Sequence, residues 1–247
     1  MAAAMARGWA RAEDGPERML FADSGSGRAA ALAEEVGGEA VGSLAELAER
    51  SDLVVLAVKP KALEEAAKPI AGKVEAVVSV LGATSLEALR DALGATPVLR
   101  TMPNLAVEIG RGVICHTPVS KSEGALMEAL ALLASLGTLV ELDESKIDPA
   151  TAVMGCAPAY LALACEALID AGVEAGLDPD LSDRLVREGA AGLGEHQLLR
   201  DPAELQRAIA SPGGSTEAGL DALAAAEVPA AFRGAVVASL ERMAGTR

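Results

Sequence analysis

The run Leu53-Val-Val-Leu-Ala-Val58, closed by Lys59-Pro60, decides the fold of this 247-residue chain. A continuous apolar run that ends at a proline is typical of a strand buried on both faces. Such strands occur in parallel sheets that are covered by helices on each side. The run therefore predicts an α/β domain in which strands and helices alternate.

The segments on both sides of this run repeat the alternation. Apolar runs predict further strands at 19–23, 74–81, 97–100, 112–116 and 137–142, with helices at 2–12, 28–36, 43–50, 61–71, 85–93 and 122–135. Short links, several of them containing glycine, join these elements. This order is that of a doubly wound, Rossmann-like sheet with parallel strands.

After Asp143 the pattern is helical almost without interruption. We therefore expect two domains, residues 1–146 and an all-helical domain at 147–247. The helix expected at 150–172 is apolar on more than one face, and about 100 residues provide too little mass to bury it. The helical domain is therefore expected to pack against another subunit, in a homodimer or a larger even homo-oligomer.

Composition excludes several classes of function. The net charge is −15, with 36 acidic and 21 basic residues, which argues against nucleic-acid partners and an anionic membrane surface. No uninterrupted apolar run reaches the roughly 18–20 residues that span a bilayer, and no signal-peptide pattern opens the chain. Three cysteines without metal-ligand spacing fit the reducing cytoplasm. Two distant histidines predict neither a zinc site nor a Ser-His triad.

The turn Ser211-Pro-Gly-Gly-Ser-Thr216 separates two short helical patterns. Pro212 ends the first helix, and the two glycines that follow allow backbone conformations closed to other residues. Ser215 and Thr216 are expected at the N-cap of the second helix, whose free N–H groups favour an anion. The plainer interpretation of the same residues is a capped turn between helices.

Four other segments lie where strands of the predicted sheet end, which is where doubly wound folds bind ligands. They are the Asp23–Arg28 loop, Ala57–Pro60, Ser79-Val-Leu-Gly82 and Arg100-Thr-Met-Pro-Asn104. Each segment alone is equally well explained as an ordinary strand end or turn.

Together, and followed by Gly155-Cys-Ala-Pro-Ala-Tyr160 and the Ser211–Thr216 turn, these segments resemble one family, pyrroline-5-carboxylate reductase. The resemblance implies that residues 1–146 bind a dinucleotide and that the helical domain dimerises. It implies the last step of proline synthesis, in which a hydride from NAD(P)H reduces Δ1-pyrroline-5-carboxylate to L-proline.

The resemblance also assigns the site residues. Thr216 would be the catalytic residue, which contacts the ring nitrogen of the substrate, and backbone amides of the same turn would hold the substrate carboxylate. The substrate-binding residues would be Gly213, Gly214, Ser215 and Thr216, and the cofactor would lie over Ala57, Val58, Lys59, Pro60 and Asn104.

The loop at 23–28 bears on the choice between NADPH and NADH. Asp23 stands where an acid that holds a ribose 2′-hydroxyl is usual, which favours NADH. Ser24, Ser26 and Arg28 offer two hydroxyls and a guanidinium suited to a phosphate, which favours NADPH. A polar surface loop is a third interpretation; we expect NADPH, held through Ser24 and Arg28, with NADH possible.

Departures from the family pattern leave two alternatives open. Leu81 and Leu105 replace smaller or polar residues, which would permit a different cyclic imine as substrate. The first strand and its Gly-rich loop are missing, which would suit a catalytically silent paralogue that binds a small carboxylate. Met1 falls on a methionine of that loop, so we expect that the natural protein starts upstream. Restoring about ten residues would then tighten weak cofactor binding.

Overall fold

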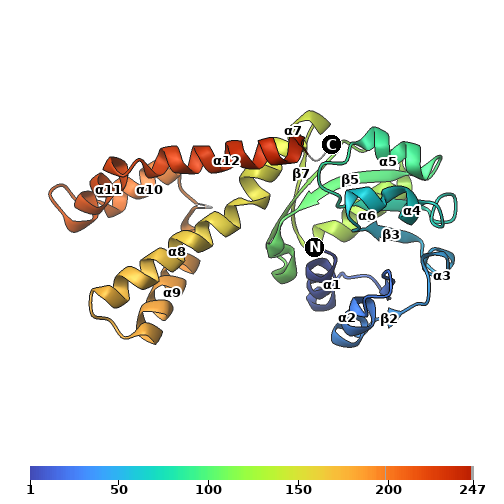
Figure 1. Ribbon diagram of the computed structural model, residues 1–247, viewed down its shortest axis with the longest axis horizontal. Coiled ribbons are helices and arrows are strands. Elements are labelled where there is room, and N and C mark those ends of the chain that lie inside the picture. Colours follow the sequence, from blue (N-terminus) through green and yellow to red (C-terminus); the bar gives the residue numbers. More distant parts are fainter. Residues whose placement is uncertain (198, 246–247) are drawn as a thin grey trace. The chain divides into compact units, whose positions relative to one another are not determined.

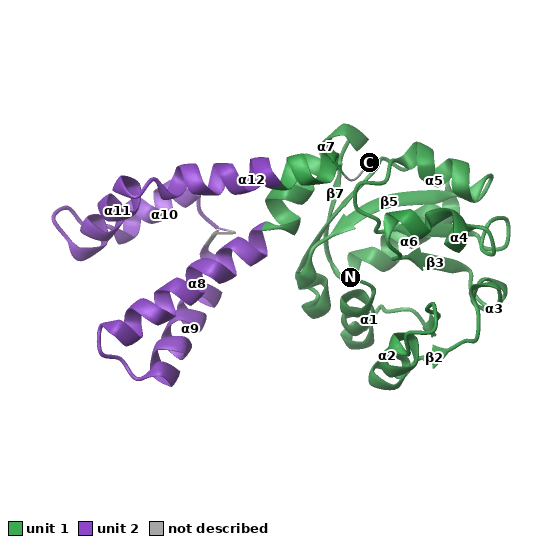
Figure 2. Cartoon of the chain, in the orientation of Figure 1, with its two compact units in different colours: residues 1–156, 239–247 green, residues 157–238 purple. Residues whose placement is uncertain are grey.

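The computed structural model describes residues 1–197 and 199–245, and the chain divides into two compact units (Figure 2). Unit 1 comprises Met1–Cys156 together with the end of the chain from Ser239, and unit 2 comprises Ala157–Ala238. The predicted domain boundary at 146/147 lies slightly earlier in the chain and stays a prediction. Residues 198 and 246–247 of the predicted helical domain lie outside the described residues.

Unit 1 alternates strands with helices, and the predicted α/β class is confirmed (Figure 1). Its strands are β1 (Leu20–Phe21), β2 (Glu39–Ala40), β3 (Leu53–Leu56), β4 (Ala76–Ser79), β5 (Val98–Pro103), β6 (Gly112–His116) and β7 (Gly137–Glu141). Its helices are α1 (Ala2–Arg11), α2 (Arg28–Val36), α3 (Leu44–Glu49), α4 (Leu63–Ala67), α5 (Leu86–Leu93), α6 (Gly124–Ala134) and α7 (Glu144–Ala150), with 3₁₀ turns η1 (Pro60–Ala62) and η2 (Leu105–Ile109).

Five strands form one sheet in the order β3-β4-β5-β6-β7. The pairs β3–β4, β4–β5 and β6–β7 are parallel, as predicted, but β5 and β6 are antiparallel, with Thr101 opposite His116. The reason is the connection between them: η2 is too short for the crossover that a parallel pair requires. The expectation of a wholly parallel sheet is therefore wrong at this pair.

The remaining two strands form a separate sheet. β1 pairs with β2 in parallel, Leu20 opposite Glu39 and Phe21 opposite Ala40. β2 was not predicted, since both of its residues are exposed and no apolar run marks them. Among the described residues, no strand bonds to both β1 and β3, so the sheet is divided between these two strands.

Alternating side chains along β3 and β4 fill two hydrophobic clusters, one on each face of the sheet. In β4, Val77 belongs to the cluster formed with α4 and α5, while Val78 belongs to the cluster formed with α1 and α6. In β3, Val54 and Val55 divide in the same way. The apolar runs are therefore continuous because both faces are covered, as the sequence indicated.

Gly8 allows helix α1 to pack directly on η2. A Cβ at this position would meet the carbonyl oxygen of Val107 and would lie 2.7 Å from Cδ2 of Leu136. Gly8 is therefore required for this close packing.

Unit 2 is helical, as predicted. Its helices are α8 (Ala157–Glu174), α9 (Pro179–Gln197), α10 (Pro202–Ile209), α11 (Ser215–Ala225) and the greater part of α12 (Val228–Ala244). Helices α8 and α9 pack closely, because the buried Ser182 hydroxyl donates to the Ile169 carbonyl at 2.8 Å beside Gly172. A π-helical turn (Thr151–Gly155) joins α7 to α8, so that Glu144–Glu174 is one long helix.

This long helix meets the length and composition of a membrane span, although no uninterrupted apolar run of that length is present in the sequence. Only 6% of its most apolar window is buried within the chain. The paired helices α11 and α12 meet the same test only when taken together, across a bend of 50°. Core helices of soluble proteins meet the same criteria. The finding therefore identifies an apolar surface on this helix, and either a membrane or other protein surface would bury it.

Replacing Gly8 by alanine should destabilise the protein. The added methyl group collides with backbone and cannot be accommodated by a side-chain rotation, so we expect a loss of about 1–3 kcal/mol in the free energy of unfolding. Urea unfolding followed by circular dichroism measures this loss. Gly124→Ala is the matched control, since its Cβ would meet nothing within 4 Å; equal stability of the two variants would contradict the packing argument.

Candidate active site

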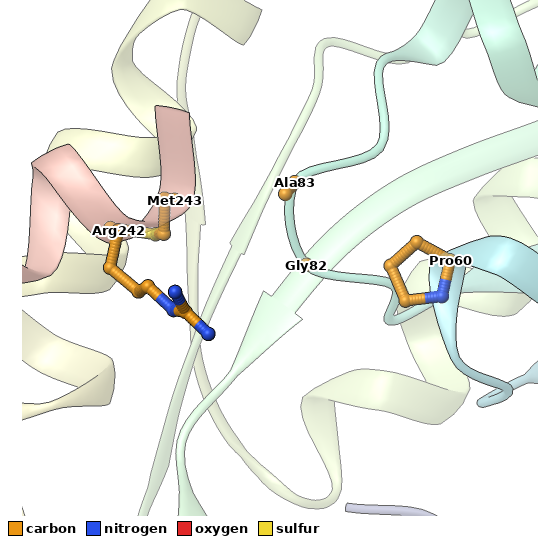
Figure 3. Close-up of a pocket in the computed structure, with 5 residues that line it drawn as sticks. All are labelled: Pro60, Gly82, Ala83, Arg242 and Met243. Atoms are coloured by element: carbon orange, nitrogen blue, oxygen red, sulfur yellow. The ribbon is translucent and has the colours of Figure 1, made fainter. Parts of the chain in front are cut away.

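The carboxyl ends of β3 and β4 lie together at one edge of the sheet. Segment Ala57–Pro60 follows β3, and the turn Gly82–Ser85 links β4 to α5. Both border a hollow of about 690 Å³, and Pro60, Gly82 and Ala83 also line a smaller one of about 270 Å³ with Arg242 and Met243 (Figure 3). Arg100 lines the larger hollow as well, so the structure brings together residues of three of the four segments that the sequence marked.

Within Ala57–Pro60, the residues divide between solvent and core. Ala57 and Lys59 are exposed, whereas Val58 packs against the cluster on the α4 and α5 face. Pro60 starts the 3₁₀ turn η1 and is the member of the segment that lines both hollows. A ligand at this edge would therefore meet Pro60.

The turn Gly82–Ser85 holds a strained residue that the sequence did not reveal. Ala83 has φ of +53°, in the left-handed region that residues with a Cβ rarely adopt. The Thr84 hydroxyl donates to the Gly82 carbonyl at 3.1 Å, and the Ser85 hydroxyl caps α5 by accepting from Ala88 N–H at 3.1 Å. Such strain concentrates at ligand-binding positions, where the surrounding structure must hold it.

Leu81, which precedes this turn, is buried in the core with 1% of its surface exposed. It lines neither hollow. Its size therefore affects the packing of the sheet and α-helices and not the shape of the hollows.

Asn104 follows β5 and is buried, with both ends of its amide engaged. Its Oδ1 accepts from the N–H of Val113 at 3.1 Å, and its Nδ2 donates to the Met154 carbonyl at 3.3 Å. These bonds tie the end of β5 to β6 and to the π-helical turn. The contact with a cofactor that the sequence suggested for Asn104 stays a prediction.

The loop after β1 is organised by Asp23. Its Oδ1 accepts the N–H groups of Gly25 and Ser26, and its Oδ2 accepts the Ala29 N–H and the Ser26 hydroxyl, all at 2.7–2.9 Å. These bonds, that from Ala29 foremost, lower the pKa of Asp23 to about 2. The carboxylate is therefore ionised throughout the physiological range and already has two donors on each oxygen.

The same loop presents a cation to solvent. Arg28, exposed at the start of α2, donates from Nε to the Ser26 hydroxyl at 2.9 Å. Gly27 precedes it in the left-handed conformation, with φ of +77°. The loop thus holds its guanidinium beside an exposed serine hydroxyl.

The turn of unit 2 differs in one respect from the prediction. The N-cap of α11 is Gly214, which has no side chain to cap with, and Ser215 and Thr216 are the first two helical residues. The prediction that the two hydroxyl residues occupy the cap was therefore wrong by one position. Their N–H groups still lie in the first turn, where an α-helix supplies no acceptor.

Two other amides of this turn already have acceptors. Gly213, with φ of +73°, donates its N–H to Glu217 Oε2 at 2.6 Å, and Gly214 donates to the Ser211 carbonyl at 2.9 Å. The turn is therefore closed by its own bonds, and Thr216 is exposed.

The sequence marked Arg100 only as the start of a strand-end segment and did not reveal that it is a buried cation lining the larger hollow. Arg100, in the middle of β5, has 1% of its side chain exposed. Its Nη1 lies 2.8 Å from Glu144 Oε1 and its Nη2 lies 2.9 Å from Asp148 Oδ1, both on α7. A charged residue within an otherwise apolar strand was the available signal, because such a charge requires partners when buried.

Within residues 1–197 and 199–245, no group of three or more His, Cys, Asp or Glu side chains is arranged to hold a metal ion.

Comparison with known proteins gives a match in each half of the chain. Residues 144–246 match the family model described as pyrroline-5-carboxylate reductase dimerisation, and residues 1–83 match that described as NADP oxidoreductase coenzyme F420-dependent. A pyrroline-5-carboxylate reductase of Thermus thermophilus is 39% identical, over 78% of this chain and 74% of that protein. One of Pseudomonas aeruginosa is 34% identical, over 96% of this chain and 90% of that protein.

Solved structures agree with these relatives. A pyrroline carboxylate reductase of Plasmodium falciparum with NADP bound has a TM-score of 0.84 at 28% identity, over 98% of this chain and 93% of that one. A 1-pyrroline-5-carboxylate reductase of Streptococcus pyogenes has a TM-score of 0.85 at 28% identity, over 98% of this chain and 94% of that one. On its fold, its sequence and its helical unit, this chain belongs to the pyrroline-5-carboxylate reductase family.

Proposed function

We propose that this chain reduces Δ1-pyrroline-5-carboxylate to L-proline with NADPH as the hydride donor. The observation that carries the proposal is the likeness to reductases of this name over nearly the whole chain, at 34% identity with the Pseudomonas aeruginosa enzyme. The turn Ser211–Thr216, which the sequence marked as an anion site, lies within the matched length and begins a helix.

For this reaction the protein mainly has to position the substrate relative to the cofactor. When bound, the dinucleotide supplies a hydride for the imine carbon, whose C=N π electrons pass to a nitrogen that keeps its proton. A protonated imine is already electrophilic, so no nucleophile or metal is needed to activate it. The chain's task is to hold the ring in the correct orientation.

Thr216 would contact the ring nitrogen through its hydroxyl group, as the family resemblance implies. The substrate carboxylate would bind at the start of α11, where backbone N–H groups favour an anion. Because Gly213 and Gly214 already donate within the turn, we assign the carboxylate chiefly to the amides of Ser215 and Thr216. The two glycines then contribute by shaping the turn.

For the cofactor, we propose the edge formed by Ala57, Val58, Lys59 and Pro60, with Asn104 and the loop residues Ser24 and Arg28. The hollow beside Pro60 offers the space. The Asp23 carboxylate has its lone pairs engaged by the loop, which leaves it poorly placed to accept a ribose hydroxyl. Arg28 is exposed and suited to a phosphate, and this favours NADPH over NADH.

A different cyclic imine as substrate receives less support. That alternative depended on Leu81 and Leu105, and Leu81 is buried in the core away from both hollows. We therefore favour pyrroline-5-carboxylate.

Oligomerisation follows from the family, and we propose a homodimer formed through α8 and the helices after it. Leu161, Leu163 and Leu168 on α8 are each about 60% exposed within one chain. A second copy would cover them and would account for the apolar length of the helix 144–174. The three cysteines are free, in keeping with a cytoplasmic enzyme.

Loss of the Thr216 hydroxyl should slow the reaction. The wild-type chain should consume NADPH when pyrroline-5-carboxylate is added, followed by absorbance at the nicotinamide band. Thr216→Ala should lower turnover by roughly ten- to a hundredfold, since a hydrogen bond to a charged group contributes about 1.5–3 kcal/mol. Its NADPH affinity should be unchanged. Wild-type kinetics in the variant would show that the substrate does not contact Thr216.

Arg28 should select NADPH over NADH. We expect wild-type protein to bind NADPH more tightly, and Arg28→Ala to lose roughly ten- to a hundredfold in NADPH affinity with NADH affinity retained. Fluorescence titration with each cofactor measures both. Arg90→Ala removes an exposed cation from α5 and should alter neither affinity. A wild-type preference for NADH, or unchanged NADPH binding in Arg28→Ala, would reject the phosphate assignment.

Light scattering of dilute protein should give at least twice the chain mass of 24.9 kDa. Leu161→Glu should shift the protein towards monomer, because an uncompensated charge would be buried in the interface. Ile109→Glu is the control, since Ile109 is 66% exposed, against 59% for Leu161, but lies in unit 1. A wild-type chain that scatters only as monomer would refute the dimer.

A further inference from the structure

Glu144 is shared by two parts of unit 1. Its Oε1 accepts from Arg100 Nη1 at 2.8 Å and also from the backbone N–H of Leu86 at 2.5 Å. Leu86 is the first residue of α5, and its N–H is one of those that the helix leaves without an internal acceptor. One carboxylate therefore neutralises a buried cation and caps a helix.

The capped helix start continues directly from the turn Gly82–Ser85. This turn carries the left-handed Ala83 and lines both hollows beside Pro60. A strained conformation of this kind persists only where neighbouring groups fix it. On the side of α5, the fixing groups are the Ser85 hydroxyl and the Glu144 carboxylate.

Arg100 keeps Glu144 in place. The guanidinium is fully buried, while the Glu144 side chain is 38% exposed and would otherwise be free to turn towards solvent. Leaving a buried guanidinium without its carboxylate is costly, so the ion pair holds the glutamate against the sheet. Arg100 and Glu144 both line the larger hollow.

We propose that Glu144 is a positioning residue for the cofactor, which fixes the turn Gly82–Ser85 against Pro60 through its bond to Leu86. The proposal rests on the proposed function, because it takes the hollow beside Pro60 as part of the cofactor site. Glu144 is also the first residue of the helix 144–174.

Asp148 provides the matched comparison. It lies one helical turn further along α7 and binds the other terminal nitrogen of Arg100 at 2.9 Å. Glu144, and not Asp148, accepts the N–H of Leu86. Removing either carboxylate takes away one of the two carboxylates that neutralise Arg100, but only Glu144→Ala also removes the acceptor of the Leu86 N–H at the start of α5.

The test compares Glu144→Ala, Asp148→Ala and Glu144→Gln in the full chain. NADPH affinity is measured by fluorescence titration, and hydrogen exchange is followed at the amides of residues 82–86. Glu144→Ala should weaken NADPH binding at least tenfold and speed exchange at these amides. Asp148→Ala should change NADPH affinity less than threefold, even if its melting temperature falls by as much as that of Glu144→Ala.

Glu144→Gln should recover most of the affinity, because its amide oxygen can still accept from Leu86. Equal losses of affinity in both alanine variants, or unchanged exchange at 82–86 in Glu144→Ala, would reduce Glu144 to a stabilising ion pair and overturn the proposal. A wild-type chain that binds no NADPH would overturn the proposed function and the cofactor role together. The exchange comparison would then still decide whether Glu144 holds the turn.

Discussion

Burial of the sheet on both faces is the constraint from which the rest of unit 1 follows. Side chains of β3 and β4 alternate between two apolar clusters, which leaves no room for ligand-binding groups along the strands themselves. Polar chemistry is therefore confined to the strand ends, where backbone groups are free and loops approach one another. Arg100 is a charged residue within the sheet, and its two carboxylate partners on α7 show what a buried charge there requires.

The sequence was sufficient for the features that depend on local pattern. Leu53–Val58 predicted a strand buried on both faces, and the helical sequence pattern after Asp143 predicted a second unit. The strand directions and ion pairs that the sequence did not predict depend on contacts between residues distant in the chain. The sequence of Gly112–His116 does not indicate that this strand runs antiparallel to β5. The residues around Arg100 do not indicate that its partner is Glu144, 44 residues later.

The candidate site was predictable to the same degree. The strand-end segments and the turn at Ser211–Thr216 were found from sequence pattern and resemblance. The burial, hydrogen bonds and capping role of the individual residues within them were not. Leu81 faces the core, Asn104 has both amide ends bonded, and the cap of α11 falls on Gly214. Each depends on a backbone angle or a hydrogen-bond partner that spacing alone does not specify.

The division of the sheet between β1 and β3 has a further consequence. β3 pairs with β4 and β1 pairs with β2, and among the described residues no strand covers the remaining side of either. An uncovered strand edge exposes a row of amide and carbonyl groups that can template pairing with another chain. Within the described residues, the backbone edges of β1 and β3 are therefore places, besides the exposed leucines of α8, at which another strand can pair with this chain.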